Sequence, residues 1–233
     1  MVKGVYEIFG VEKPLIGMIH LAGRDLDERV KRGLSEIELL EEVGFNGVII
    51  EDFHGTPDDV YECLAESSKR GFNIVRGINI LRKQYASLEW ADKFGARFVQ
   101  FDSVLSNTLQ VERYNLERST YPSIAVLGGA RFKYQPSTEK SLEEDLEEAM
   151  ERCDVIVTTG DGTGIETPLD KLKSFREVLG DFPLVVGAGV NRYNIKDQME
   201  ICDGAIIGSA LKPNSNTRAG IKKEYAEDLI NRI

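Results

Sequence analysis

The sequence has few of the residues that mark a secreted scaffold or a membrane protein. Among 233 residues there are 3 cysteines, with no C-x-x-C pair, and only 7 prolines. An odd number of cysteines argues against a disulfide scaffold and suits a reducing compartment. Residues 1–10 contain no apolar core of signal-peptide length, and no apolar run approaches the roughly 18 residues of a membrane span. We therefore expect a cytoplasmic protein without membrane insertion.

The chain also has fewer positively charged residues than negatively charged ones. The chain has 29 Lys and Arg against 39 Asp and Glu, so its net charge is −10 at pH 7. This balance argues against a nucleic-acid partner, but it leaves room for a local positive pocket that binds a small anion. The rest of the composition is ordinary, with 42% apolar residues. The length suits a single domain spanning residues 1–233.

Eight short runs rich in β-branched residues recur along the chain, separated by polar, helix-like segments. Near-continuous apolar runs are typical of strands that are buried on both faces. Eight β-then-α units predict an α/β fold, a single (β/α)8 TIM barrel with a parallel sheet. An open, doubly wound sheet is the alternative, although no run resembles an edge strand. The runs begin near Pro14, Gly47, Asn73, Arg97, Ser123, Asp154, Pro183 and Asp203.

Glycines and small polar residues mark the expected helix ends. Gly44 and Gly95 stand between a helical segment and the next strand, where glycine often ends a helix. Thr138 and Thr167 are expected to begin the helices after the fifth and sixth strands. Asn191 is expected to open the helix after the seventh strand.

Function in such a barrel is located at the carboxyl ends of the strands, and the opposite rim serves stability. Cys153 and Cys202 precede the sixth and eighth strands and Cys63 lies within a helix, so we expect all three to be small buried apolar residues. The two histidines, His20 and His54, follow the first and second strands, on the functional rim. His54 is equally compatible with a purely structural role in its loop.

Polar side chains end the second, third and fourth strands. Glu51 and Asp52 end the second strand, and because side chains alternate, only one of the two can point into the barrel. Converging carboxylates there would act as a general base or hold a divalent cation such as Mg²⁺. The structural alternative is that they cap helices or pair with Arg76. The catalytic candidates are His20, Glu51, Asn79 and Asp102, with Asp52 as a substrate-binding candidate.

Two glycine turns follow the seventh and eighth strands, one starting at Gly187 and the other at Gly208. A phosphate group needs converging N–H donors and close backbone approach, which glycines permit. In these barrels the loops after strands seven and eight supply such a cradle. The alternative is that the glycines serve tight packing only. The phosphate-binding candidates are Gly164, Gly187, Gly189, Gly208 and Ser209.

The loop after the sixth strand, residues 158–164, can surround an anion or a sugar hydroxyl with backbone donors and threonine oxygens. The alternative is a flexible loop that ends at the next helix. Lysines after the fifth and eighth strands are candidate ligands for a substrate anion, whereas the sixth strand has no lysine, which weakens a Schiff-base aldolase mechanism. The further substrate-binding candidates are Lys133, Thr159, Asp161, Thr163 and Lys212.

Over nearly its whole length the chain resembles the BtpA family, which includes SgcQ-like proteins. The resemblance implies a TIM barrel, and the family is named for a role in photosystem I biogenesis. It also favours Glu51 over Asp52 as the inward carboxylate. The matching segments are residues 16–20, 49–53, 77–82, 163–164, 186–190 with Asn194, and 203–212.

The chain departs from the family after the fifth strand. Relatives tend to have an acidic, histidine-containing phrase that ends in Lys-His, whereas residues 128–134 keep Lys133 and lack the acid and the histidines. The loop after His20 is also shorter, and Lys83-Gln84 replaces the usual Asn-Asp. A metal site or an acid–base pair built on the fifth strand is therefore not expected.

Two functions remain open. The first is an enzyme of isomerase or lyase type that acts on a small phosphorylated metabolite such as a phosphosugar or a phosphorylated nucleoside-like compound. The second is a non-catalytic accessory or ligand-sensing protein, as the family name suggests, that retains the phosphate site. A homo-oligomer is compatible with either function.

Overall fold

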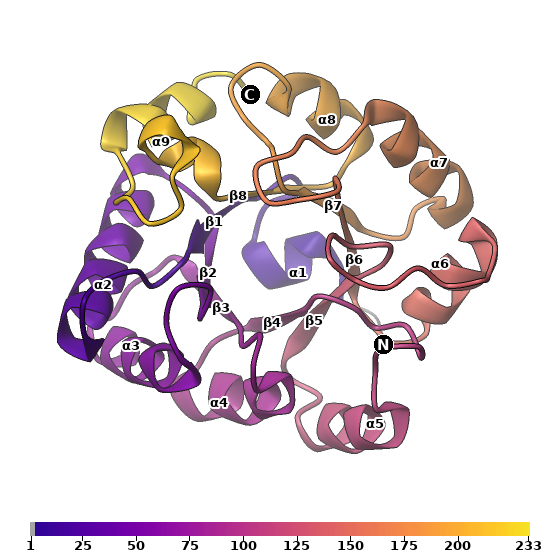
Figure 1. The fold of residues 1–233 in the computed structure, drawn as a ribbon, viewed down its shortest axis with the longest axis horizontal. Helices are drawn as coiled ribbons and strands as arrows, with labels where there is room; N and C mark the ends of the chain where they lie inside the picture. The colour runs from indigo at the N-terminus through magenta and orange to yellow at the C-terminus, as the bar shows by residue number, and fades with distance from the viewer. Residues whose placement is uncertain (1–2) are drawn as a thin grey trace.

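Eight parallel strands enclosed by a ring of helices make up the fold (Figure 1). This computed structural model describes residues 3–233, so the first two residues of the expected domain lie outside it. Each strand pairs with the next along the chain and the last pairs with the first, which closes the barrel. The predicted (β/α)8 TIM barrel is confirmed, and the open doubly wound sheet is excluded.

The strands occupy the predicted runs. They are β1 (Leu15–Ile19), β2 (Gly47–Glu51), β3 (Val75–Asn79), β4 (Phe98–Phe101), β5 (Ala125–Gly129), β6 (Val155–Thr159), β7 (Leu184–Gly187) and β8 (Ala205–Ile207). The α-helices are α1 (Val5–Phe9), α2 (Leu26–Val43), α3 (Pro57–Lys69), α4 (Ser87–Phe94), α5 (Val111–Thr120), α6 (Leu142–Met150), α7 (Leu169–Leu179), α8 (Ile195–Ile201) and α9 (Lys223–Ile230). Three 3-10 helices complete the chain: η1 (Gln84–Ala86), η2 (Ser209–Leu211) and η3 (Pro213–Ser215).

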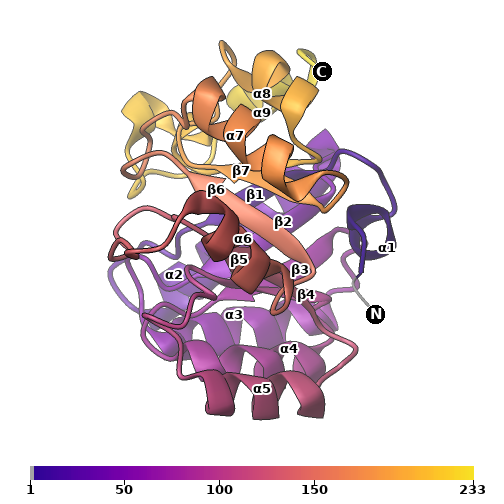
Figure 2. The same ribbon diagram turned by 90° about the vertical axis from the view of Figure 1, so that its right-hand side faces the viewer.

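The amino-terminal end of the barrel is filled by apolar side chains and covered by α1. Phe9 of α1 packs against Phe98 of β4 with ring centroids 5.1 Å apart. Gly77 leaves the space that Phe98 needs, because a β-carbon there would lie 2.3 Å from its ring. Figures 1 and 2 show α1 across this end of the ring of strands. Polar side chains gather at the opposite, carboxyl end, which we call the mouth.

Several helices begin later than the sequence indicated. The α6 helix begins after Ser141 rather than Thr138, because Ser141 and Glu144 form a capping box. The Thr167 hydroxyl donates to the Gly187 carbonyl oxygen (2.9 Å) instead of capping α7. The α8 helix begins after Asn194, and not at Asn191. The helix ends are as expected, since the glycines after α2 and α4 have φ angles of 101° and 68°.

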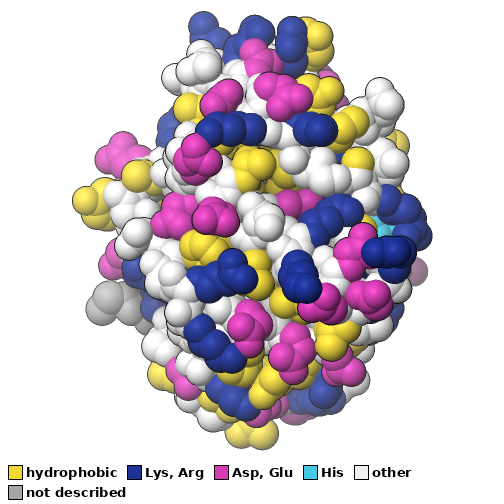
Figure 3. All heavy atoms as spheres, turned by 90° about the vertical axis from the view of Figure 1, so that its left-hand side faces the viewer, with side chains coloured by type: hydrophobic (Ala, Val, Ile, Leu, Met, Phe, Trp, Pro, Cys, Tyr) yellow, Lys and Arg dark blue, Asp and Glu magenta, His cyan; other side chains and the backbone are white. Residues whose placement is uncertain are grey.

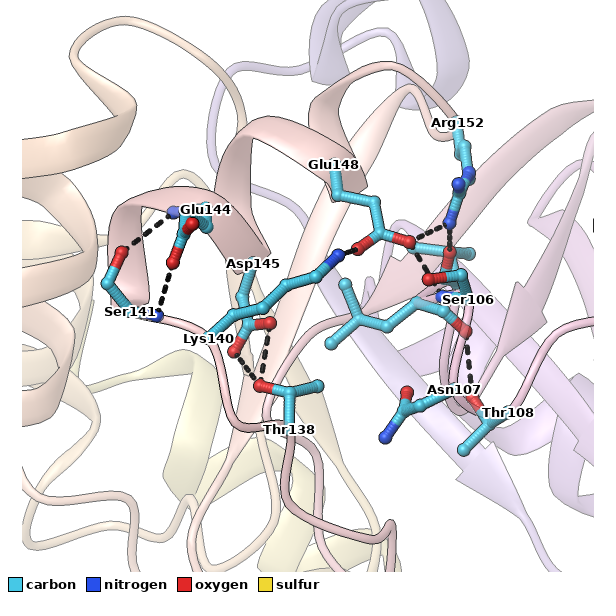
Figure 4. A network of polar contacts seen from close by, with 12 residues as sticks. Ser106, Asn107, Thr108, Thr138, Lys140, Ser141, Glu144, Asp145, Glu148 and Arg152 are labelled. Atoms are coloured by element: carbon cyan, nitrogen blue, oxygen red, sulfur yellow. Dashed lines mark hydrogen bonds and ion pairs between the residues drawn. The ribbon is translucent and has the colours of Figure 1, made fainter.

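A polar network fastens α6 to the loop that follows β4 (Figure 4). The carboxylate of Glu148 accepts from the backbone N–H of Ser106 at 2.7 Å and from the side chains of Lys140 and Arg152. The Arg152 guanidinium also donates to the carbonyl oxygen of Val104 (2.9 Å). Burial alone would raise the pKa of Glu148, but these hydrogen bonds outweigh it and lower the pKa to about 2. The network therefore anchors a loop at the mouth to an outer helix.

The outer surface carries both signs of charge, interspersed over the face shown in Figure 3. Many of these side chains form ion pairs, such as Lys31 with Asp27 at 2.7 Å. Within residues 3–233, none of the helices has the length and apolarity needed to cross a bilayer. The three cysteines are buried as predicted, and burial raises the pKa of each thiol to about 12.

Candidate active site

A single amide joins two carboxylates at the mouth. The register of β2 and β3 places Glu51 beside Asn79. The Asn79 Nδ2 donates to Glu51 Oε1 at 3.1 Å and to Asp102 Oδ1 at 2.9 Å. Both amide hydrogens of Asn79 are thereby used, and the two carboxylates are held on either side of one nitrogen.

The Glu51 carboxyl is nearly inaccessible, with 7% of the residue exposed. Burial, followed by the negative charge of Asp102, raises the pKa of Glu51 to about 8, against the opposing charge of Lys133. The structural alternative, pairing with Arg76, is not observed. The Arg76 guanidinium instead donates to the Ser67 hydroxyl at 3.0 Å. At neutral pH the Glu51 side chain therefore holds a proton that it can give up.

Asp52 turns away from Glu51, as alternation along a strand requires. Its Oδ1 accepts from the backbone N–H of Leu81 at 2.7 Å, and its Oδ2 lies 3.2 Å from Arg82 Nη1. The residue is fully buried. The Asp52 carboxylate thus ties the end of β2 to the loop after β3, and the site described below does not use it.

Gln100 of β4 is a polar residue at the mouth that sequence reasoning missed. Its Nε2 donates to Asp102 Oδ1 at 3.0 Å, and only 2% of the residue is exposed. Among residues 3–233 its Oε1 has no hydrogen-bond partner. Because Gln100 lies on β4 two positions before Asp102, which follows the strand, the alternation rule could have found it. The buried amide oxygen of Gln100 is therefore an acceptor without a donor among the described residues.

His20 follows β1 and is buried against a lysine. Lys212 Nζ lies 3.0 Å from His20 Nδ1 and donates to the carbonyl oxygen of Thr217 at 3.2 Å. Burial and then the charge of Lys212 lower the pKa of His20 well below its usual value. Burial also lowers the pKa of Lys212, to about 8. His54 lies farther out, with Nε2 2.8 Å from the Thr217 hydroxyl.

The predicted phosphate-binding glycines come together where the loops after β6, β7 and β8 meet. A β-carbon added at Gly164 would lie 3.2 Å from the Ser209 hydroxyl oxygen. A β-carbon at Gly189 would lie 2.3 Å from the backbone nitrogen of Glu166. Gly164 and Gly189 have φ angles of 78° and 62°, which favour glycine. Gly189 therefore permits close packing between the loop after β7 and the loop after β6.

The glycine turns also border the acid–base side of the mouth. A β-carbon at Gly208 would lie 2.9 Å from His20 Cε1 and 3.4 Å from His20 Nε2. Gly187 ends β7 beside Thr159 of β6. Within residues 3–233, these turns keep four backbone N–H groups without an acceptor in the protein. They belong to Gly189, Val190, Ser209 and Ala210.

The loop after β6 contacts the loop after β5. The Thr159 hydroxyl accepts from the backbone N–H of Lys133 at 2.7 Å. The Tyr134 hydroxyl lies 3.3 Å from the Thr163 hydroxyl and accepts from the Thr163 backbone N–H at 2.9 Å. Tyr134 was not among the predicted site residues. Asp161 is exposed.

The expected divalent cation stays a prediction. Among residues 3–233, no group of three or more His, Cys, Asp and Glu side chains is placed to hold a metal ion. Mg²⁺ usually uses one or two carboxylates together with waters and substrate phosphates, so it does not require such a group. Glu51 and Asp102 are the carboxylates at the mouth that fit this description.

The model of the BtpA family matches residues 11–233. This chain belongs to the BtpA family. It is 29% identical to an uncharacterized protein of Methanocaldococcus jannaschii, over 94% of this chain and 95% of that protein. It is 25% identical to the photosystem I biogenesis protein BtpA of Synechocystis, over 93% of this chain and 86% of that protein.

Among solved structures, phosphoribosyl anthranilate isomerase from Thermococcus kodakaraensis is similar in fold. The TM-score is 0.63 with 14% sequence identity, and the match covers 94% of this chain and 97% of that chain. At such an identity the likeness concerns the barrel alone. The likeness carries no information on the chemistry at the mouth of this BtpA-family chain.

Proposed function

We propose that this BtpA-family protein is an enzyme of isomerase or lyase type that acts on a small phosphorylated metabolite, such as a phosphosugar. The observation that carries the proposal is the arrangement of Glu51, Asn79 and Asp102, a protonated acid held beside a second carboxylate. This acid–base group lies in the same mouth as the glycine turns. A phosphate held at the turns would place the carbon chain of the ligand near the carboxylates.

The phosphate half of the proposal rests on Gly164, Gly187, Gly189, Gly208 and Ser209. Backbone N–H groups without a protein acceptor are the donors that an anion needs, and they occur in both glycine turns. Lys133 is half-buried, and its charge acts on both Glu51 and His20. It is the cation that we assign to a second anionic group of the ligand.

The acid–base half rests on the raised pKa of Glu51. A carboxyl group with a pKa near 8 can donate a proton at neutral pH and can accept it again from a carbon or a hydroxyl group. Asp102 accepts hydrogen bonds from Asn79 and Gln100, which fix the position of its carboxyl group. The pair thus places the protonated Glu51 and a second acidic side chain on either side of one amide, an arrangement suited to proton transfer between neighbouring ligand atoms.

His20 supplies the polar partner for a developing oxyanion. Its pKa is lowered, so the imidazole is neutral at pH 7 and can donate one hydrogen bond without carrying charge. The glycine at position 208 leaves its Nε2 uncovered on the side of the phosphate turn. Asn79, Glu51 and His20 come from three adjacent strands, so one ligand could contact them together.

Carbon-bound proton exchange tests this function directly. The protein is incubated in D₂O with short-chain aldose and ketose phosphates, with and without Mg²⁺, and proton NMR follows the loss of C–H signals. We expect exchange or conversion of at least one compound by the wild type and none by Glu51→Gln. The matched control is Asp52→Asn, because Asp52 belongs to the same strand end and faces away from the mouth. Equal activity of Glu51→Gln and the wild type would refute the assignment.

The second candidate is a ligand-sensing protein that binds a phosphorylated compound without converting it. Its support is the stretch after β5, which keeps Lys133 but has no acid and no histidine. A thermal-shift series separates the two functions. A sugar phosphate that stabilises the protein and is consumed supports the enzyme, whereas one that stabilises it and persists unchanged supports the sensor.

A further inference from the structure

Lys212 was predicted to bind substrate, but the structure gives its ammonium group two partners within the protein. Only 2% of the residue is exposed. Its Nζ lies 3.0 Å from His20 Nδ1 and 3.2 Å from the Thr217 carbonyl oxygen. The lysine follows η2, and its side chain reaches from the end of β8 to ring nitrogen Nδ1 of His20 at the end of β1.

An ammonium group has three donors and no acceptor. Its contact with Nδ1 therefore requires that this ring nitrogen accept the hydrogen bond. A neutral imidazole that accepts at Nδ1 carries its hydrogen on Nε2. Because the pKa of Lys212 is lowered only to about 8, its charged form still predominates at pH 7 by about ten to one. The lysine can thus select one of the two neutral forms of His20.

The other ring nitrogen, Nε2, lies on the side of the glycine turn that starts at Gly208. His20 Nε2 is 3.4 Å from the point that a β-carbon on Gly208 would occupy. A hydrogen on Nε2 is then available to an oxygen atom of a ligand held by the turns after β7 and β8. A hydrogen on Nδ1 would instead face the ammonium group of Lys212.

We propose that Lys212 is a positioning residue, which holds His20 as the neutral Nε2–H tautomer so that this N–H donates to a ligand oxygen at the mouth. The ligand part rests on the proposed function, whereas the tautomer does not. In this role Lys212 acts through His20, and it replaces the expectation that the lysine binds substrate directly.

The charged groups around His20 agree with a neutral ring. After burial, the influences on its pKa come from Lys212, Lys133, His54 and Arg32, and all four lower it. Of these four, Lys212 is the one that contacts a ring nitrogen. Lys133 contributes charge without a hydrogen bond to the ring, which makes it a matched control for the charge alone.

Nitrogen-15 NMR of the histidine rings tests the tautomer in the intact protein. The chain has 2 histidines, so a His54→Gln variant assigns both sets of signals. At pH 7 we expect Nδ1 of His20 to have the chemical shift of an unprotonated nitrogen and Nε2 that of a protonated one. A protonated Nδ1 in the wild type would overturn the proposal without the need for a Lys212 variant.

Three variants then isolate the role of the lysine. Lys212→Met should populate the second tautomer and raise the pKa of His20, because a donor and a neighbouring charge are both lost. Lys212→Arg should keep the wild-type tautomer. Lys133→Met should raise the pKa of His20 without changing the tautomer. An unchanged tautomer in a folded Lys212→Met protein would show that the lysine does not select it.

These results separate the inference from the proposed function. The nitrogen shifts and the pKa of His20 are measured without any ligand. Titration with inorganic phosphate then asks whether the Nε2–H proton of His20 shifts when an anion binds at the glycine turns. A correct tautomer with no response to phosphate would refute the ligand contact and leave the positioning by Lys212 in place. A wrong tautomer would refute the positioning whether or not phosphate binds.

Discussion

Glu51 and Asn79 are register partners on β2 and β3, and the amide nitrogen of Asn79 lies 3.1 Å from the carboxylate of Glu51. The same nitrogen donates to Asp102, so Asn79 cannot turn away from one carboxylate without losing the other. The strand register therefore determines the distance between the two acids. Burial is the main cause of the raised pKa of Glu51, and the nearby Asp102 adds to it, since two buried carboxylates close together cannot both be charged without cost.

Glu51→Gln should remove turnover by a factor of roughly 10²–10⁴ and leave ligand binding intact, because the amide keeps the shape but cannot transfer a proton. Stability should also change with pH in a defined direction. The pKa of Glu51 is about 8 in the folded protein and near 4.5 when unfolded, so the folded state holds the extra proton between these values. Wild-type stability should therefore fall as the pH rises through this window.

Thermal melts between pH 5 and 9 measure this effect. In Glu51→Gln the decline of Tm with rising pH should be smaller than in the wild type. Asp52→Asn should retain most of the decline, because Asp52 ranks below burial and Asp102 among the causes that raise the pKa of Glu51. If Tm of the Glu51→Gln protein declined as steeply as that of the wild type, the pH dependence of stability would have to come from another group.

Ser209→Asp should abolish binding of inorganic phosphate, because it places a negative charge beside Gly164 where the anion is expected. Ser209→Ala should bind phosphate with only a modest loss, since the backbone donors remain. Isothermal titration calorimetry measures both affinities. We choose Ser209 over Gly189, because any side chain at Gly189 would collide with the backbone of Glu166 and unsettle the fold. Unchanged affinity of Ser209→Asp for phosphate would show that the anion does not bind at these turns.

Much of the barrel could be predicted from periodicity alone, because each strand is a short apolar run between polar segments. The first residues of the helices were harder to predict. Thr138 and Ser141 are both good capping residues, and the choice depends on the later Glu144 and on the bond from Thr138 to Asp145. The α1 helix, which covers the amino-terminal end of the barrel, has only five residues, too few for a helical pattern to stand out.

The mouth could be predicted residue by residue but not in its contacts. Alternation established that only one of Glu51 and Asp52 faces inward, and the family resemblance favoured Glu51. The hydrogen bond from Asn79 shows that Glu51 is the inward one. Lys212 follows its strand, as a substrate ligand would, yet its long side chain turns to His20 and contacts Nδ1. Sequence spacing carries no information on that direction, which is decided by packing among β1, β8 and η2.

Cys153→Ala and Cys202→Ala should each lower the free energy of unfolding by about 1–3 kcal/mol, since each deletes a buried sulfur and leaves a small cavity. Both residues precede their strands, at the end of the barrel opposite the mouth. Affinity for inorganic phosphate should therefore be unchanged in the double variant. Urea denaturation and calorimetry give the two quantities, and loss of phosphate binding in a folded double variant would contradict the placement.

The network of Figure 4 should make the loop after β4 sensitive to acid. The pKa of Glu148 is lowered to about 2 by its hydrogen bonds, so its contribution to stability is fully present above about pH 4.5 and is lost as the pH falls towards 2. Glu148→Gln should cost about 2 kcal/mol at pH 7, because bonds to a charged acceptor are replaced by weaker ones.

The cost of Glu148→Gln should shrink as the pH is lowered, since the wild-type carboxylate is then neutralised as well. Denaturation curves of both proteins between pH 2.5 and 7 measure this convergence. Glu147→Gln is the matched control, because it removes the same charge from the neighbouring position of α6. Hydrogen exchange at the Ser106 amide gives a local readout, since that N–H donates to Glu148 at 2.7 Å. Faster exchange in Glu148→Gln alone would tie the lost stability to this loop, whereas equal exchange in all three proteins would show that the network does not anchor it.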